Sequence, residues 1–316
     1  MNIRSGMKAA GLLFVLLAGT SFLQAQNTRS WVSGVGDDAN PCSRTAPCKT
    51  FAGAFAKTNA GGEIDALDGG GYGTLTITKA ITIDGSGGNV AGILPNGVPA
   101  FTINAGVNDV VVLRNISING ALVGIGVPGI KFNSGAALHI ENCVISSNTG
   151  NGIEFTPAAQ GSELFVSNTT LLENGTASST GNALVRSVGG TVVNAIFSNV
   201  RFERGGVGLR VEDGGYVTVR NSYSAGNRHN GFLVVSTTLQ AILTLVNSTS
   251  SFNLTNGISS VNPSAVVRIA DDTVVDNAGA ALISTNSGQI LSFTQGGAGT
   301  NNIVGPGAPT GFIPRL

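Results

Sequence analysis

One segment of the sequence gathers arginine with aromatic and histidine side chains. Five of the twelve arginines fall between residues 201 and 228, namely Arg201, Arg204, Arg210, Arg220 and Arg228. Guanidinium groups bind carboxylates through paired hydrogen bonds and stack on flat rings, so this composition suits sugar rings and uronate groups. The candidate ligand-binding residues are Arg201, Arg220, Tyr223, Arg228 and His229. The other interpretation is a solvated face with local counter-ions, which would be Glu203, Glu212 and Asp213.

Two pairs of adjacent carboxylates could do acid–base chemistry. Asp271 and Asp272 are weak catalytic candidates, whereas Glu212 and Asp213 precede two glycines and indicate a turn between strands. The two histidines, at positions 139 and 229, do not have the spacing of metal ligands. The sequence therefore predicts no metal site and no resident cofactor.

Cysteine usage favours an oxidising compartment. Cys42 and Cys48 lie close enough in the chain to close a small loop through a disulfide. Cys143 stands in an apolar run, which indicates a small buried side chain rather than a nucleophile.

A repeat runs through the central part of the chain. Its mark is an asparagine preceded by apolar residues two and four places earlier, and it recurs every 22 to 31 residues. The marked residues are Asn115, Asn142, Asn168, Asn199, Asn221 and Asn247, with Asp271 in the seventh unit. A second asparagine stands six residues after five of the marks, as Asn148, Asn174, Asn227, Asn253 and Asn277. Alternation with a period of two, bounded by Asn-Gly turns, predicts short strands rather than helices.

A mark that recurs at this interval favours a solenoid over a series of hairpins. Equivalent strands of successive coils would stack in parallel, about 4.8 Å apart. An asparagine at the same corner of each coil can hydrogen-bond along the stack and tolerates the left-handed conformation that a tight corner needs. We therefore expect the marked asparagines to form a structural ladder with their side chains turned inward.

This pattern resembles the right-handed parallel β-helix proteins of the pectate-lyase-like superfamily, over about residues 30 to 295. The resemblance implies an all-β solenoid with a short helix, near 48–57, that closes its N-terminal end, and a first strand near 61–67. Enzymes of this superfamily resemble one another in using clustered carboxylates: lyases hold calcium and use an arginine or lysine as base, and glycosidases use paired carboxylates.

If the protein were such an enzyme, carboxylates of neighbouring coils would gather at the outward-facing positions of the repeat. The row one residue before the mark and the row three residues before it contain no carboxylate cluster. Arg114 and Glu141 are successive members of the first row, and we interpret them as an ion pair between neighbouring coils. The repeat thus gives a fold without a recognisable catalytic site.

The chain divides into four segments. Residues 1–25 have a basic start, an apolar stretch and a small residue at position 25, which predicts a cleaved signal peptide and export to the periplasm or beyond. Residues 26–60 form an N-terminal segment with the helix, 61–295 the β-helix, and 296–316 an irregular C-terminal cap. The mature chain has no second apolar run long enough to span a membrane.

The balance of charges argues against a nucleic-acid-binding protein. Lys and Arg together number 17, as do Asp and Glu, so the formal net charge is zero and no footprint for nucleic acid follows. The leading hypothesis is an exported binding or structural module directed at polysaccharide, with no calcium or other cofactor. The alternatives are a polysaccharide lyase, which would use calcium, or a glycosidase, and then a surface adhesin. The sequence does not indicate an oligomeric state.

Overall fold

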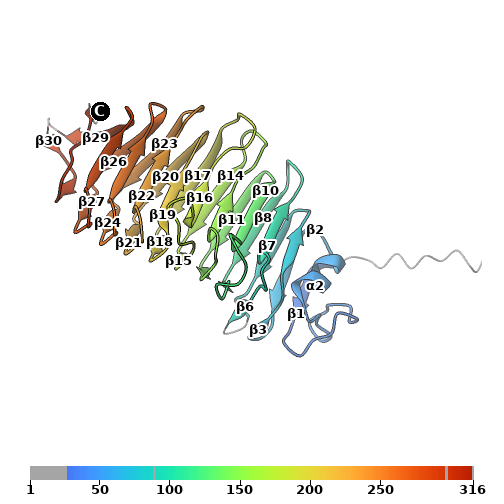
Figure 1. The fold of residues 1–316 in the computed structure, drawn as a ribbon. Coiled ribbons are helices and arrows are strands. Elements are labelled where there is room, and N and C mark those ends of the chain that lie inside the picture. The colour runs from blue at the N-terminus through green and yellow to red at the C-terminus, as the bar shows by residue number, and fades with distance from the viewer. Residues whose placement is uncertain (1–26, 88–89, 296–297, 315–316) are drawn as a thin grey trace, which may run out of the picture.

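The computed structural model describes residues 27–87, 90–295 and 298–314, and the predicted signal peptide lies outside them. The chain forms a right-handed parallel β-helix whose coils stack along one axis (Figure 1). Successive strands of one coil belong to three different sheets, called A, C and D here, and each pairs in parallel with its equivalent in the next coil. The predicted fold class is confirmed. Within these residues no helix is long and apolar enough to cross a membrane.

Each sheet is made of strands that recur once per coil. Sheet A contains β1 (Asn27–Val32), β2 (Thr58–Ala66), β5 (Ile81–Asp84), β8 (Val110–Arg114), β11 (Ala137–Glu141), β14 (Glu163–Ser167), β17 (Val193–Ser198), β20 (Gly215–Arg220), β23 (Ala241–Val246), β26 (Ala265–Ala270), β29 (Gln289–Gln295), β30 (Ala298–Gly299) and β32 (Gly311–Pro314). Sheet C contains β3 (Gly70–Gly71), β6 (Ala91–Ile93), β9 (Ile116–Asn119), β12 (Val144–Ser146), β15 (Thr170–Leu172), β18 (Arg201–Glu203), β21 (Tyr223–Ala225), β24 (Thr249–Ser251), β27 (Thr273–Val275) and β31 (Asn302–Ile303). Sheet D contains β4 (Leu75–Ile77), β7 (Phe101–Asn104), β10 (Ile130–Ser134), β13 (Ile153–Phe155), β16 (Gly181–Val185), β19 (Val207–Val211), β22 (Phe232–Val235), β25 (Ile258–Val261) and β28 (Leu282–Thr285).

Alternate residues of each strand fill the interior of the coil. Phe132 and Phe155 are fully buried on neighbouring strands of sheet D, with ring centroids 4.6 Å apart. This stacking of like residues follows from the parallel register, which places equivalent positions of successive coils on top of one another. The apolar alternation seen in the sequence is therefore the core of the solenoid.

The marked asparagines form the corner between sheets A and C. All six have left-handed backbones with φ between 49° and 60°, as does Asp271. Asn199 donates to Asn168 at 2.7 Å, and Asn247 donates to Asn221 at 2.8 Å. The expectation that these side chains turn inward is wrong: five are exposed and Asn115 is half-buried. The corner residue is left-handed. It follows an outward-facing residue at the end of the sheet A strand and precedes a buried residue that leads into sheet C, and its own side chain lies on the outside of the coil.

The second asparagine row is the buried one. Asn174, Asn227 and Asn253 have no exposed surface, and Asn148 is almost fully buried. Asn148 donates to Asn174 at 2.8 Å, and Asn227 donates to Asn253 at 2.9 Å. Between these two pairs Asn182 continues the row by accepting from Asn174 and donating to Asn227. Side-chain amides thus satisfy one another along the inside of the turn that follows sheet C.

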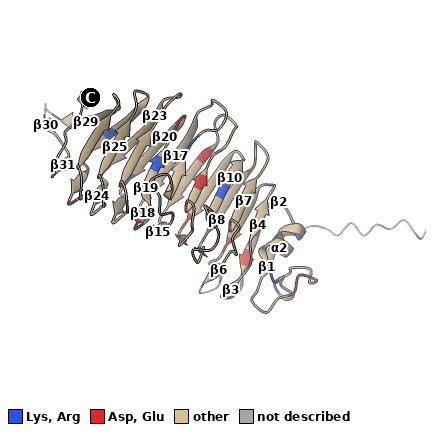
Figure 2. Ribbon diagram, viewed as in Figure 1, with Lys and Arg blue, Asp and Glu red and all other residues tan. Residues whose placement is uncertain are grey.

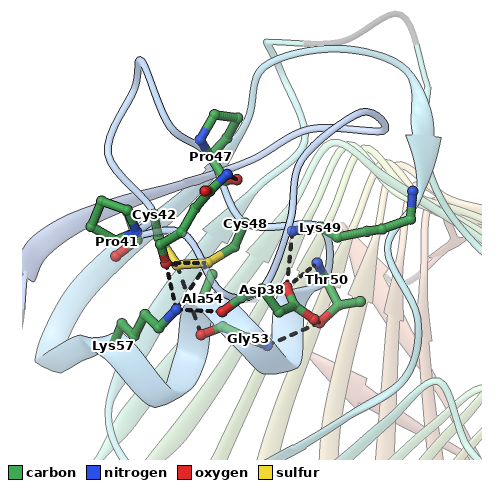
Figure 3. The surroundings of a disulfide bond; sticks show 12 residues. Asp38, Pro41, Cys42, Pro47, Cys48, Lys49, Thr50, Gly53, Ala54 and Lys57 are labelled. Carbon is green, nitrogen blue, oxygen red and sulfur yellow. Dashed lines mark hydrogen bonds between the residues drawn. A yellow bond between two sulfur atoms is a disulfide. The ribbon is translucent and has the colours of Figure 1, made fainter.

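A disulfide and a short helix precede the regular coils. Cys42 and Cys48 are bonded, as predicted, and both are fully buried. Helix α2 (Phe51–Lys57) lies beside them, and Lys57 donates to the backbone oxygens of Asp38 and Asn40 (Figure 3). The helix is shorter than the expected 48–57, and its role in closing the coil end stays a prediction.

Both ends of the chain contain more strand than expected. Within residues 26–60, β1 pairs in parallel with β2 and so belongs to sheet A. Within residues 296–316, β31 pairs with β27 and β32 pairs with β29, so sheets C and A continue into this segment.

Candidate functional site

Charged residues are sparse on the coils, and the two signs are interspersed (Figure 2). Among the described residues, the largest group joined by ion pairs lies on the outer face of sheet A, over its first four strands. Trp31, Asp65, Asp84 and Arg114 occupy one outward row in direct register from β1 to β8. Arg29 and Glu63 form the neighbouring row on β1 and β2. We call these six residues the N-terminal cluster.

Ion pairs tie the N-terminal cluster together across the strands. Arg29 pairs with Asp65 through Nε and with Glu63 at 3.1 Å through Nη2. Arg114 pairs with Asp84 at 2.8 Å through Nε and with Glu63 at 3.5 Å through Nη2. Glu63 therefore stands between two guanidinium groups. The carboxylate side chains keep between 12% and 30% of their surface exposed, so an external ligand can reach them.

The environment moves the pKa values of two of these carboxyls in opposite directions. Partial burial, together with the adjacent Asp65 carboxyl, raises the pKa of Glu63 above its usual range. Burial acts the same way on Asp84, but hydrogen bonds from Asn115, Ser86 and Arg114 outweigh it and lower the pKa of that carboxyl. Asp84 is thus held ionised by its neighbours, and Glu63 keeps its proton more readily.

The same three carboxylates meet the distance condition for a shared cation. One oxygen of each of Glu63, Asp65 and Asp84 lies within 4.8 Å of the others. Calcium prefers such oxygen ligands. However, Arg29 and Arg114 already bind these carboxylates, and a cation would have to displace both guanidinium groups. The cluster as arranged does not fit a calcium ion.

A cleft of about 470 Å³ adjoins the N-terminal cluster at the corner between sheets A and C. Its walls include Gly85 and Ser86, which follow Asp84, and Asn115, which follows Arg114. Asn142 and Val144 of the next coil close its far side. The cleft thus joins backbone turns, amide side chains and an apolar wall beside the charged residues, a mixture that suits a hydroxyl-rich ligand.

The predicted Arg201 and Tyr223 do lie side by side. They are in register on β18 and β21 of sheet C, and the Arg201 guanidinium sits 5.3 Å from the Tyr223 ring centroid. Glu203 binds both: Arg201 pairs with it at 2.9 Å, and the Tyr223 hydroxyl donates to it. Arg204 pairs with Glu173 in the same way, at 3.1 Å. These contacts support the interpretation of a face neutralised by local counter-ions.

The remaining predicted ligand-binding residues lie on other surfaces. Arg220 is on sheet A, where its Nε donates to Ser198 Oγ at 3.3 Å. Arg228 and His229 lie in the turn after sheet C, and their backbone N–H groups donate to Gly205 and Gly206. The structure therefore does not gather the five residues into one site.

The two carboxylate pairs have structural partners. Asp272 is almost fully buried and accepts from the backbone N–H of Ser248 at 2.7 Å and of Ala270 at 2.9 Å. Asp271 is exposed at the left-handed corner, where the other coils have asparagine. Asp213 accepts from the backbone and hydroxyl groups of Thr237 and Thr238, as a turn residue does.

Sequence reasoning missed the N-terminal cluster because the repeat mark is absent there. Gly85 and Ala66 stand where later coils have the corner asparagine. The sequence did contain a signal, because the carboxylates alternate with buried apolar residues. Glu63 and Asp65 flank buried Ile64, and Asp84 follows buried Ile83. Aligning those strands on their apolar residues would have placed the carboxylates on one face.

A family model and one solved structure agree with this architecture. Residues 155–295 match a family model described as a right handed beta helix region. The crystal structure of pectate lyase Pel9A superposes with a TM-score of 0.53 and 16% sequence identity, covering 90% of this chain and 79% of that one. The GH136 lacto-N-biosidase from Eubacterium ramulus gives a TM-score of 0.38 and 10% identity, over 98% of this chain and 70% of that one. No curated protein sequence is significantly similar to the chain. Residues 155–295 thus match the right-handed β-helix family model, and the chain shares the fold of the pectate lyase.

Proposed function

We propose that this protein is an exported module that binds polysaccharide along the outer face of sheet A, starting at the N-terminal cluster. The observation that carries the proposal is the outward row in which Trp31 stands beside Asp65 and Asp84. An indole ring offers a flat surface for a sugar ring, and carboxylates beside it accept hydrogen bonds from sugar hydroxyl groups.

A second stacking surface lies further along the same face. His139 and Phe165 occupy equivalent outward positions on β11 and β14, and their rings stack with centroids 4.7 Å apart. An extended chain crossing the coils from Trp31 would pass over this pair. The name of the structural neighbour, a pectate lyase, also supports a carbohydrate ligand.

Trp31 makes the proposal directly testable because it is the only tryptophan in the chain. Titration with neutral and acidic polysaccharides, followed by Trp31 fluorescence and by calorimetry, should give a saturable change with at least one of them. The W31A variant should bind that polysaccharide about tenfold more weakly by calorimetry, a loss on the order of 1 kcal/mol. Absence of any signal with every polysaccharide would overturn the proposal.

The matched control is the double variant R201A/Y223A on sheet C. It removes an arginine and an aromatic ring that already engage Glu203, and we expect binding to be unchanged. Loss of binding in this variant, with W31A unaffected, would instead place the ligand on sheet C.

A second candidate function, glycoside hydrolysis, rests on the carboxylates of the N-terminal cluster. Oxygens of Glu63 and Asp84 lie within 4.8 Å of each other, and their pKa values are shifted in opposite directions, as an acid and its partner carboxylate require. In this reading Glu63 would protonate the leaving oxygen. New reducing ends that disappear in E63Q while binding persists would support hydrolysis, and a protein that binds glycan without releasing any would exclude it.

A further inference from the structure

The C-terminal end of the solenoid leaves part of its interior uncovered. Leu245, Ile269 and Ser292 follow one another along an inward row of sheet A, and each keeps at most 2% of its surface exposed. Phe312 on β32 is the next member of this row, yet 66% of it is exposed. The row therefore ends in an aromatic side chain at a core position, with no further coil above it in the described residues.

Sheet C ends in a similar way. Ile303 on β31 lies in register with the fully buried Val274 and packs against the core, but it stays partly exposed. The next residue, Val304, is 56% exposed. Strands β31 and β32 each pair with one strand, so within the described parts of the chain their outer edges are unpaired. A solenoid needs a cover over such an end, because apolar side chains and strand edges are otherwise left in water.

The N-terminal end differs, because the chain itself covers its outermost strand. The N–H of Trp31 on β1 donates to Cys42 O, and the N–H of Cys48 donates to Trp31 O, both at 2.9 Å. The loop that the disulfide closes thus occupies the outer edge of β1. Exposed charges of both signs surround it, among them Asp37 and Arg44. A second copy cannot add its strands to this edge, so stacking of the C-terminal end of one copy on the N-terminal end of the next is blocked.

The C-terminal end meets the condition for pairing with its own copy. Residues 277–314 contain no Asp, Glu, Lys, Arg or His, and they include the last strand of each sheet, β28, β31 and β32. A two-fold axis brings each side chain opposite the same surface of the other copy, so a charge near the axis would face its own like charge. An uncharged apolar end avoids that repulsion.

We propose that the C-terminal ends of two copies of this chain pack against each other around a two-fold axis near Phe312. Each copy then covers the open interior of the other, and Phe312 and Val304 become buried. Pro314 has no N–H and limits strand pairing at the edge of β32, so side chains make most of the contact. A two-fold contact closes on itself and gives a dimer rather than a fibre. Because the two ends of the solenoid are far apart (Figure 1), the N-terminal clusters lie at opposite ends of the pair.

The test measures the molar mass of the purified protein by sedimentation equilibrium over a wide range of concentrations. We expect the mass to rise from that of one copy to that of two and no further. F312D and F312K should each weaken the association at least about a hundredfold, because like charges then meet near the axis. An equal mixture of F312D and F312K should restore the dimer, since opposite charges face each other in the mixed pair. The circular dichroism of both variants should match the original protein.

The matched control is F252D. Phe252 is 63% exposed, close to the value for Phe312, but it follows β24 and lies away from the C-terminal end. F252D should therefore dimerise like the original protein. An original protein that stays monomeric at every concentration, an equal loss of dimer in F252D, or no recovery in the mixture would overturn the inference, as would a mass that grows beyond two copies. Polysaccharide binding through Trp31 is measured separately, so the proposed function and this inference can fail independently.

Discussion

Arg114 binds Asp84 on the coil before it, although Glu141 lies in register with it on the coil after it. The Nε of Arg114 is 2.8 Å from Asp84 Oδ2, whereas Glu141 forms no ion pair with any described residue. The expected pair between Arg114 and Glu141 is therefore wrong. Asp84 is the more buried partner and is already fixed by Asn115 and by the N–H of Ser86, so its carboxylate is positioned before the arginine reaches it.

A double-mutant cycle can measure this preference. We expect R114A and D84N to show a coupling free energy of about 1 kcal/mol, because one side chain of the pair keeps a third of its surface in water. The cycle between R114A and E141Q should give a value close to zero. Urea unfolding of the three single variants, the two double variants and the original protein supplies both coupling free energies, and the reverse order of the two couplings would contradict the structure.

The fold could be predicted because the repeat carries its own register. One corner asparagine per coil, with apolar residues two and four places earlier, identifies sheet A and its direction from the sequence alone. What the pattern could not show is which way the corner side chain points. Asn221 and Asn227 look equivalent as polar repeat residues, yet Asn221 is exposed and Asn227 is fully buried. That difference depends on where the left-handed corner falls relative to the coil axis.

The candidate site was harder to predict for a related reason. In the sequence, one strand of sheet C and one strand of sheet D separate Glu63 from Asp84. The two residues meet only because β2 and β5 are neighbours in sheet A. Conversely, Arg220 and Tyr223 are three residues apart in sequence but lie on different sheets, since the corner at Asn221 stands between them. Proximity in a solenoid follows the coil period rather than the sequence distance, so clusters of residues in the sequence mislead.

The two asparagine rows should differ in their contribution to stability. Asn227 donates to Phe202 O and Asn253 Oδ1 and accepts from Asn182 and the Gly205 N–H, all inside the coil. Replacing it with alanine leaves several buried groups without partners, and we expect N227A to lose about 3 kcal/mol or more. N221A should lose only about 1 kcal/mol, from left-handed strain and one exposed hydrogen bond. Thermal or urea unfolding of both variants tests the order, which equal losses would refute.

Cysteine reactivity should separate the three thiols cleanly. Burial raises the pKa of Cys143 to about 12, so its thiol stays protonated and inaccessible in the folded protein. A thiol reagent should therefore modify no cysteine in the native protein and one cysteine after unfolding without reductant. Unfolding with reductant should expose three. A native protein that reacts at once would show that Cys143 is accessible or that the bond between Cys42 and Cys48 is open.

Asp272 should make stability depend on pH between about 4 and 7. Burial raises its pKa to about 7 from the usual 3.8, although two backbone N–H groups oppose the shift. The folded protein therefore holds this proton more tightly than the unfolded chain does. The contribution of Asp272 to the free energy of unfolding is therefore greatest below pH 4, falls as the pH rises towards 7, and is constant above it. The total loss should be at most about 4 kcal/mol.

The repeat itself supplies the control variant for this prediction. In the two preceding coils the equivalent residues are Ser222 and Ser248, and each hydroxyl accepts the backbone N–H of the equivalent residue one coil earlier. A serine at position 272 can accept from Ser248 in the same way but cannot ionise. Urea unfolding of D272S should therefore lack the fall in stability that Asp272 causes between pH 4 and 7, and D272S should be the more stable protein at pH 7. If stability changed with pH to the same extent in the original protein and in D272S, the pH dependence would come from another group and the prediction would be wrong.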